Sequence, residues 1–286
     1  MTLNPVCPSC RETRSRPLLA KDGYAYRACL GCGGAWLHPR PASAESLYDA
    51  SYFLGGAHGG YVDYEADEAI HRANAVRRLD LIGRVHPGPP GRVLDVGCAV
   101  PFFLDEARSR GWQVVGVDAS GWARERARER FCIDVRARID GVAEGDVAVA
   151  TLYQVLEHVV EPTDTLNAVH RCLQPGGALV LETWDRASAV ARLFGRYWQQ
   201  VTPPSVVHLF TRDGLSALLR RTGFDDVRFE RASKAVSVGF VAGLLARKHP
   251  RLFGGLAAIA RHRLVRSREL HYSLGDLITV TARRRG

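Results

Sequence analysis

The sequence predicts an α/β protein in which a doubly wound parallel sheet follows a small N-terminal four-cysteine ribbon. Two observations predict this fold class. Between residues 91 and 130, short apolar runs alternate with charged helical stretches, which is the βαβα order of a doubly wound sheet. Before residue 35, the chain contains two CxxC motifs. A chain of 286 residues has room for one large domain and a small appendage.

The two CxxC motifs predict a zinc ribbon over residues 1–40, with eighteen residues between the second and third cysteines. Each CxxC turn directs two sulfurs at one point, so two turns complete a tetrahedron of thiolates with no open position. We therefore expect a structural Zn²⁺. No charged N-terminal segment with an apolar core is seen, so we expect a cytoplasmic protein, in which disulfides are disfavoured. The expected ligands are Cys7, Cys10, Cys29 and Cys32.

Residues 41–90 predict a linker and an N-terminal helical segment. A short helix and a glycine-rich loop are expected first, and a longer helix from about Glu65 to Arg84 follows. The run "HPGPPG" at 86–91 then ends the helical pattern. The main domain is expected to span residues 91–286.

The first strand of that domain is the β-branched run "GRVLDVGC", which is typical of a buried parallel strand. A helix from residue 101, a second strand ending at Asp118 and a second helix from Gly121 follow. Asp118 lies 21 positions after Gly97. An acidic residue at about this spacing binds ribose hydroxyls in dinucleotide-type folds, although an Asp before a helix also serves as an N-cap.

The motif D-x-G-x-A, which begins at Asp95, resembles the first motif of class I S-adenosylmethionine-dependent methyltransferases. The stretches 145–162 and 173–183 resemble the fourth and fifth strands of that family with their flanking turns. Residues 203–224 and the final "DLITVTARR" resemble the C-terminal part of the ubiquinone-biosynthesis methyltransferases. The resemblance covers nearly the whole chain. It implies the Rossmann-like methyltransferase sheet with S-adenosylmethionine as the cofactor.

The resemblance also implies the cofactor site. It places the methionine end of the cofactor at the first motif, its ribose after the second strand, and its sulfonium after the fourth strand. Tyrosines before the domain, Tyr61 and Tyr64, are expected to close the pocket. Contacts to adenine are expected at Arg138, Ile139 or Asp140. The residues implied are, in the same order, Asp95, Gly97, Cys98 and Ala99; Asp118 and Ala119; and Leu152, Tyr153 and Gln154.

The first motif departs from the family pattern at Ala99 and Pro101. Proline suits the first position of a helix, because its fixed φ is helical and its missing N–H has no intrahelical partner there. We expect the other N–H groups of the turn to face the cofactor carboxylate. The sequence therefore predicts a modified site that still binds the cofactor.

Methyl transfer to a protonated acceptor calls for a general base, and histidine suits this role best. His208 is the first candidate, as base or substrate ligand, and its alternative is a surface-turn role. His158 is the second candidate, and its alternative is a packing role. The insertion around 184–210 is aromatic and basic, so it predicts either a lid over the acceptor or an amphipathic helix packed on the sheet.

The net charge is +9, and residues 247–286 contain ten Lys or Arg against two Asp or Glu. A solvated arginine-rich surface explains this bias best.

The leading function is methyl transfer to a small molecule, possibly acidic or sugar-linked, at oxygen before nitrogen or carbon. The alternatives are an RNA methyltransferase and a catalytically silent binding partner. No membrane span is predicted, because the apolar stretch 235–246 is too short.

Overall fold

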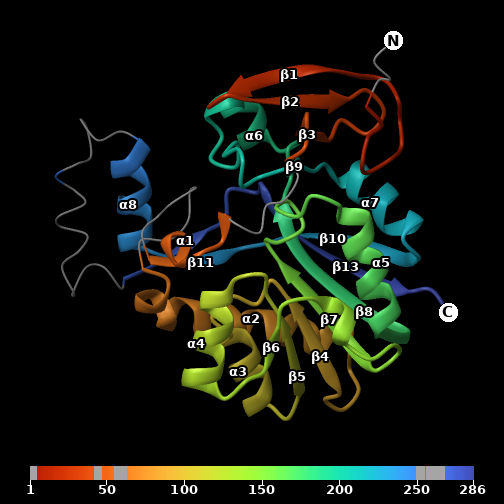
Figure 1. The fold of residues 1–286 in the computed structure, drawn as a ribbon, viewed down its shortest axis with the longest axis vertical. Helices are drawn as coiled ribbons and strands as arrows, with labels where there is room; N and C mark the ends of the chain where they lie inside the picture. Colours follow the sequence, from red (N-terminus) through yellow and green to blue (C-terminus); the bar gives the residue numbers. More distant parts are fainter. Residues whose placement is uncertain (1–4, 42–46, 55–62, 249–254, 256–267) are drawn as a thin grey trace.

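The computed structural model describes residues 5–41, 47–54, 63–248, 255 and 268–286. Its centre is a seven-stranded sheet in which five neighbouring strands are parallel, the sixth is antiparallel to them, and the seventh pairs antiparallel with the sixth (Figure 1). This confirms the predicted fold class, and the final strand is antiparallel as expected. In spatial order the strands are β6 (Val135–Arg136), β5 (Gln113–Val117), β4 (Arg92–Val96), β7 (Val147–Tyr153), β8 (Leu173–Trp184), β13 (Leu277–Arg284) and β10 (Phe224–Arg231).

Helices cover both faces of this sheet, so its central strands are apolar on both sides. Neighbouring residues of β4 show the alternation: Val93 packs with the helices of one face, and Leu94 with those of the other. The first face is covered by α2 (Glu68–Val85), α3 (Phe102–Ser109) and α4 (Gly121–Phe131), and the second by α5 (Pro162–Cys172) and α7 (Arg212–Arg221).

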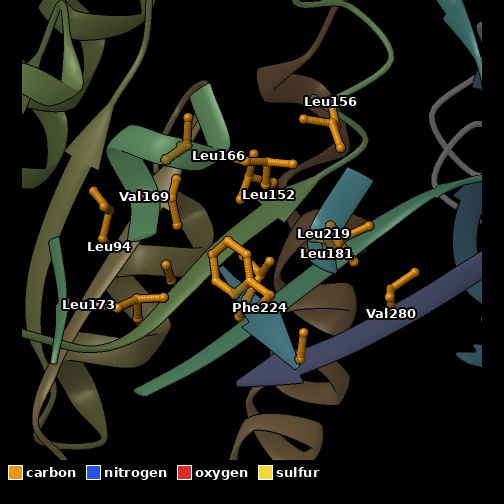
Figure 2. Close-up of a cluster of buried hydrophobic side chains, with 14 of the residues drawn as sticks. Leu94, Leu152, Leu156, Leu166, Val169, Leu173, Leu181, Leu219, Phe224 and Val280 are labelled. Carbon is orange, nitrogen blue, oxygen red and sulfur yellow. The ribbon is translucent and has the colours of Figure 1, made fainter. Parts of the chain in front are cut away.

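Figure 2 shows part of the core between the sheet and the second face. Leu152 and Leu181 project from adjacent central strands towards Leu166 of α5 and Leu219 of α7, and all four are fully buried. Burying one such side chain contributes about 1.5–3 kcal/mol. This core fixes the carboxyl ends of β7 and β8, which carry the residues described below.

The N-terminal ribbon forms a second sheet from β1 (Ser15–Lys21), β2 (Tyr24–Cys29) and β3 (Ala35–Leu37). Its fourth strand, β9 (His208–Leu209), comes from the main domain, and Trp36 pairs with His208 in antiparallel register. A shared apolar cluster joins the two parts, with Tyr26 and Leu37 against Trp184 and Trp198. The sheet of the ribbon therefore includes part of the segment that follows β8.

A third, two-stranded sheet of β11 (Lys234–Ser237) and β12 (Glu269–Tyr272) lies over α2. Asn74 of α2 fixes it, because its Nδ2 donates to the Ala235 carbonyl and its Oδ1 accepts from the Ala235 N–H, each at 2.9 Å. Near it in Figure 1 are α1 (Ala50–Leu54) and α8 (Val238–Lys248). Within the residues described, no helix is both long and apolar enough to cross a membrane.

The remaining short elements are η3 (Glu65–Asp67), η4 (Ile139–Gly141), α6 (Ala189–Phe194) and η5 (Gly195–Tyr197). The last two form the insertion predicted around 184–210. Of its large apolar residues, Trp198 is buried, whereas Leu193 and Tyr197 are exposed.

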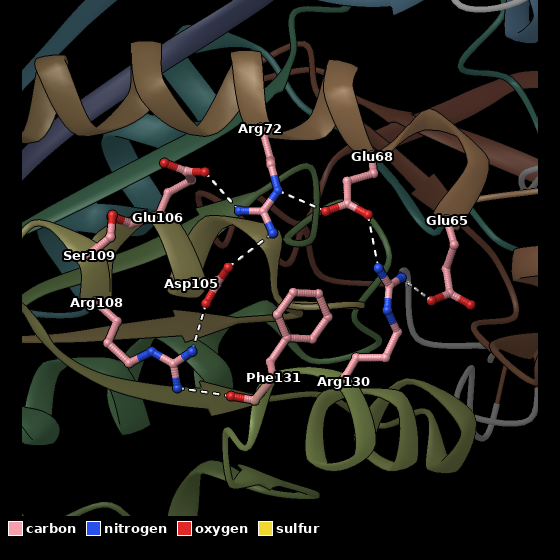
Figure 3. A network of polar contacts seen from close by, with 9 residues as sticks. All are labelled: Glu65, Glu68, Arg72, Asp105, Glu106, Arg108, Ser109, Arg130 and Phe131. Atoms are coloured by element: carbon pink, nitrogen blue, oxygen red, sulfur yellow. Dashed lines mark hydrogen bonds and ion pairs between the residues drawn. The ribbon is translucent and has the colours of Figure 1, made fainter.

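Arg72 ties α2 to α3 (Figure 3). Its guanidinium donates to Glu68 on its own helix at 2.8 Å and to Asp105 and Glu106 of α3 at 3.0 and 2.7 Å. Arg130 of α4 also donates to the Glu68 carboxylate, at 2.9 Å. The three helices of one face are thus joined by a charge network that links the first turn of α2 to α3 and to the last turn of α4.

Candidate active site

A cavity of about 1620 Å³ opens beside the carboxyl ends of the parallel strands, where doubly wound sheets bind their ligands. A site for one drug-sized molecule measures about 300–1,000 Å³, so this cavity has room for two. One part is lined by the turn after β4, the end of β5 and η4, and another by the ends of β7 and β8 together with β11.

The turn after β4 has a backbone that favours glycine at two positions. Gly97 has φ +72°, and a Cβ there would lie 2.4 Å from Val155 Cγ2. Ala99 has φ +51°, although it carries a side chain. The N–H groups of Gly97 and Cys98 donate to the Val117 carbonyl at 2.7 and 3.2 Å. The N–H of Ala99 donates to Asp118 Oδ2 at 2.8 Å. These three groups are directed into the protein, which differs from the expectation that they face the ligand.

Asp118 stands at the end of β5 in the cavity wall. Its Oδ1 accepts a hydrogen bond from the Ser120 N–H at 2.8 Å, while Oδ2 accepts from Ala99. Burial raises the pKa of this carboxyl, and the two N–H donors oppose that effect. A carboxylate offers about four lone-pair sites, so Asp118 can hold the turn and still accept hydrogen bonds from two hydroxyls. The N-cap alternative falls to Ser120, whose Oγ accepts from Ala123 N.

Pro101 precedes α3 as its N-cap, one position earlier than the sequence suggested. Its carbonyl accepts the first helical hydrogen bond, from Asp105 N at 2.9 Å. The helix therefore starts without help from an N–H at residue 101. The N–H groups of Gly97, Cys98 and Ala99 already bond within the protein, so they do not form a set of free donors for the ligand. The missing N–H of Pro101 therefore does not interrupt such a set.

The cavity wall includes most of the residues implied as cofactor ligands, namely Tyr64, Gly97, Ala99, Asp118, Ala119, Tyr153 and Gln154, together with Arg138, Ile139 and Asp140. Asp95, Cys98 and Leu152 are buried behind it. Asp95 accepts a 2.6 Å hydrogen bond from Thr151 Oγ1, and burial raises its pKa to about 7. Tyr61 lies outside the described residues.

Aromatic side chains close the cavity on the side of α1. Tyr64 stacks on His71 with ring centroids 4.0 Å apart, and Phe53 stacks on Trp122 at 4.9 Å. Trp122 is in the first turn of α4, directly after Asp118 and its cap. The aromatic residues of α1 and η3 thus cover the part of the cavity that begins at Asp118.

The two candidate histidines lie in different environments. His158 is in the cavity wall, and its Nδ1 lies 2.7 Å from the Ser205 carbonyl. That contact requires a proton on Nδ1, so Nε2 of the neutral ring carries a lone pair. His208 is 1% exposed, does not line the cavity and stacks on Phe210. Burial lowers the pKa of His208 to about 4.

Several wall residues gave no signal in the sequence. Lys234 Nζ donates to Gln154 Oε1 at 2.7 Å, and the same Nζ lies 5.0 Å from the centre of the Trp184 ring. Arg78 of α2 pairs with Glu182 at 2.5 Å and covers the Tyr153 ring at 3.9 Å. Lys234 and Arg78 belong to no motif and lie far apart in the sequence, so their convergence on the cavity depends on the tertiary fold.

The four predicted cysteines converge in the ribbon. Their sulfurs all lie within 4.8 Å of one another, with 3.8 Å between Cys7 and Cys32 and 3.5 Å between Cys10 and Cys29. Four thiolates around Zn²⁺ at about 2.3 Å would stand roughly 3.8 Å apart. The arrangement therefore has the size and donor set of a tetrahedral zinc site.

Comparisons with known proteins agree with this architecture. A methyltransferase domain model matches residues 61–228. A ubiquinone biosynthesis O-methyltransferase of Xanthomonas oryzae pv. oryzae is 31% identical over 157 residues, which are 49% of this chain and 63% of that protein. The aligned region thus spans less than two thirds of that relative's length.

Two solved structures are similar in fold. Phosphoethanolamine N-methyltransferase 2 of Haemonchus contortus, solved with phosphomonomethylethanolamine and S-adenosylhomocysteine, has a TM-score of 0.55 at 17% identity, covering 88% of this chain and 63% of that one. A putative methyltransferase of Bacillus halodurans has a TM-score of 0.54 at 14% identity, covering 75% of this chain and 100% of that one. The domain match, the strand order and the glycine turn after β4 agree with one another. This chain therefore belongs to the class I S-adenosylmethionine-dependent methyltransferase family.

Proposed function

We propose that this protein transfers a methyl group from S-adenosylmethionine to a small-molecule acceptor. One observation carries the proposal: a single cavity connects the Asp118 turn with a wall containing His158, Trp184 and Lys234. A donor and an acceptor bound in one cavity can be held for in-line displacement, and such positioning supplies much of the rate of a transfer reaction. The bound cofactor would supply an electrophilic methyl group on a sulfonium.

The chain's own residues fit this cofactor. Asp118 would accept hydrogen bonds from the two ribose hydroxyls, and Ala119 and Ile139 would contact the adenine. Tyr153 and Gln154, just past β7, would lie beside the sulfonium. Asp95 would act indirectly, because its bond to Thr151 joins the ends of β4 and β7. Cys98 and Leu152 would support the turn and the strand from behind the wall.

His158 is better placed than His208 to touch an acceptor. We assign it the role of accepting a hydrogen bond from the acceptor through Nε2, since Nδ1 is anchored on Ser205. His208 would support this loop from behind, because its buried ring places Nε2 3.2 Å from the Val160 carbonyl. Replacing His208 should then affect stability before it affects catalysis.

The chemistry of the wall supports a hydroxyl-rich acceptor, such as a sugar or a specialised-metabolism intermediate, methylated on oxygen before nitrogen or carbon. Amide and hydroxyl groups are offered by Gln199, Gln200, Thr202 and Ser205, and flat apolar faces by Trp184 and Tyr272. This combination of aromatic faces with a few placed polar groups suits a small polar ring.

The ribbon would hold one structural Zn²⁺ through its four cysteines. The metal would have no open coordination position, so its contribution would be to fold the ribbon. Because β3 follows Cys32 and pairs with β9, this zinc would also stabilise the strand that precedes α7.

Calorimetry with S-adenosylhomocysteine tests the cofactor assignment. We expect micromolar affinity, on the order of −8 kcal/mol, and severe loss in Asp118→Ala. Because Asp118 also binds the Ala99 and Ser120 N–H groups, the melting temperature of each variant is measured in parallel. Glu125→Gln, at an exposed position on α4, serves as the control and should bind normally. A folded wild-type protein that does not bind S-adenosylhomocysteine would contradict the proposal.

A further inference from the structure

In the wall of the cavity, the Lys234 ammonium hydrogen-bonds to an amide oxygen, because its Nζ donates to Gln154 Oε1 at 2.7 Å. Among the residues that the structure describes, no carboxylate oxygen lies within 4.0 Å of this Nζ. Gln154 follows β7, beside the position proposed for the sulfonium. Lys234 is thus one hydrogen bond away from the place where the methyl group would be transferred.

The surrounding elements hold this lysine in place. Lys234 pairs with Tyr272 across β11 and β12, and its neighbour Ala235 is bound on both backbone groups by Asn74. Tyr272 packs edge-on against Trp184, with centroids 5.7 Å apart, and its hydroxyl donates to Asp276 at 2.7 Å. A fixed strand position and a flat aromatic neighbour confine the Nζ to the acceptor side of the cavity.

The electrostatic environment makes the Lys234 ammonium easier to deprotonate than that of an exposed lysine. Burial is the main cause that lowers the pKa of Lys234 to about 8, and the nearby Arg78 guanidinium lowers it further. Glu182, Glu157 and Asp276 oppose this effect, but Glu182 already pairs with Arg78. A pKa close to the working pH is what general-base catalysis requires.

The residue type at this position agrees with such a role. Of the 39 basic side chains of the protein, three are lysines, at positions 21, 234 and 248. Arginine keeps its proton at any physiological pH, whereas a buried lysine can lose it. In a chain that otherwise uses arginine, a buried lysine in the cavity is a group that can exchange a proton.

We propose that Lys234 is a catalytic residue that takes the proton of the acceptor during methyl transfer. This inference rests on the proposed function. The acceptor oxygen loses its proton to the neutral Nζ and forms a bond to the methyl carbon. The bond between that carbon and sulfur breaks, and its electron pair remains on sulfur. Lys234 is left as an ammonium and returns its proton to solvent through the cavity. His158, anchored on Ser205, would orient the same acceptor.

The protein's three lysines make a direct test practical. The full-length, zinc-loaded protein is labelled with ε-¹³C-lysine and titrated by NMR, and the Lys234 signal is assigned by its loss in Lys234→Arg. We expect this signal to titrate near pH 8, and Lys21, outside the cavity wall, provides the internal reference. The titration is repeated with S-adenosylhomocysteine and with sinefungin, whose ammonium group occupies the place of the sulfonium methyl.

A positive charge within about 4–6 Å shifts a titration by roughly one pH unit or more. We therefore expect sinefungin, but not neutral-sulfur S-adenosylhomocysteine, to lower the Lys234 midpoint by about one pH unit. A midpoint above 10 in the free protein, or one that sinefungin binding leaves in place, would overturn the proposal while leaving the cofactor assignment intact. A rise of the midpoint on S-adenosylhomocysteine binding would instead make Lys234 a ligand of the cofactor carboxylate. Failure of both ligands to bind by calorimetry would reject the proposed function itself.

Discussion

At the scale of single residues, the cavity wall includes a residue whose backbone conformation is unfavourable for any residue except glycine. Ala99 has φ +51° in the left-handed region, and its N–H donates to the Asp118 carboxylate. An L-residue pays about 1–2 kcal/mol in this region, which glycine does not. Asp95 also lowers the stability of the fold, because its carboxyl is buried and accepts a hydrogen bond from one hydroxyl, that of Thr151.

Replacing Ala99 by glycine should stabilise the protein by about 0.5–1 kcal/mol, because the relieved strain exceeds the added flexibility of the unfolded chain. Urea unfolding measures this gain. Cys132→Gly is the matched control, since Cys132 has the same φ of +51° at the exposed C-cap of α4. The control should gain as much without changing S-adenosylhomocysteine affinity. A loss of stability in Ala99→Gly alone would show that the Ala99 methyl group packs favourably.

Asp95 should make the stability pH-dependent. Its pKa is raised from 3.8 to about 7, so the unfolded chain ionises first and the fold loses free energy as pH rises between these values. Asp95→Asn removes this term, so the variant should equal wild type near pH 4 and be more stable at pH 8, by up to about 4 kcal/mol. Urea unfolding at both pH values measures it, with exposed Asp134→Asn as the control. Equal stability of variant and wild type at pH 8 would contradict the assignment.

At the scale of elements, α2 is joined to α3 and α4 by polar groups in addition to its buried apolar stripe. Arg72→Gln breaks three ion pairs at once and leaves Glu68, Asp105 and Glu106 near one another. We expect a loss of about 1–2 kcal/mol that shrinks in 0.5 M salt, since these groups are partly exposed. Thermal unfolding at two salt concentrations measures it. Arg110→Gln, which breaks a single exposed pair between α3 and α2, should cost less than about 0.5 kcal/mol.

The elements also show what the sequence could predict. Strands such as 92–96, the turn glycine and Asp118 were predictable because period, spacing and turn residues are local signals. The two-residue strand β9 was not, since its partner Trp36 lies 172 positions away and pairing requires the finished fold. For the same reason His208 was predicted as a base or substrate ligand, with an exposed turn as the alternative, although it is buried and does not line the cavity. Lys234 and Asn74 carried no motif. A local hint was nevertheless present, since lysine is rare in this chain.

At the scale of the whole molecule, the ribbon and the methyltransferase sheet are one packed body. Arg221 of α7 donates to the Pro8 carbonyl at 2.7 Å, and Thr211 Oγ1 donates to the Cys32 carbonyl at 2.7 Å. These contacts connect both cysteine turns to the helix that follows β9. Changes at the metal should therefore spread towards Ser205 and His158 before they reach Asp118.

Cys29→Ser should reduce bound zinc from one per chain to less than about 0.1, because three thiolates leave the tetrahedron open. Amide hydrogen exchange should accelerate in β3 and β9, while S-adenosylhomocysteine affinity stays within about threefold, since its proposed ligands lie on the main sheet. Elemental analysis, exchange mass spectrometry and calorimetry measure these effects, with Cys172→Ser, buried elsewhere, as the control. Full zinc content in Cys29→Ser would exclude this cysteine as a ligand.

The pairing of β3 with β9 also limits how the chain can be shortened. Residues 61–228 carry the family match, yet a chain cut to them would leave β9 as an open strand edge and expose Trp184, Trp198 and Val206, which Tyr26 and Leu37 now cover. An apolar surface next to an unpaired edge promotes aggregation. We therefore expect stable expression of this protein to require the ribbon from Cys7 onwards, which lies well outside the segment that defines its family.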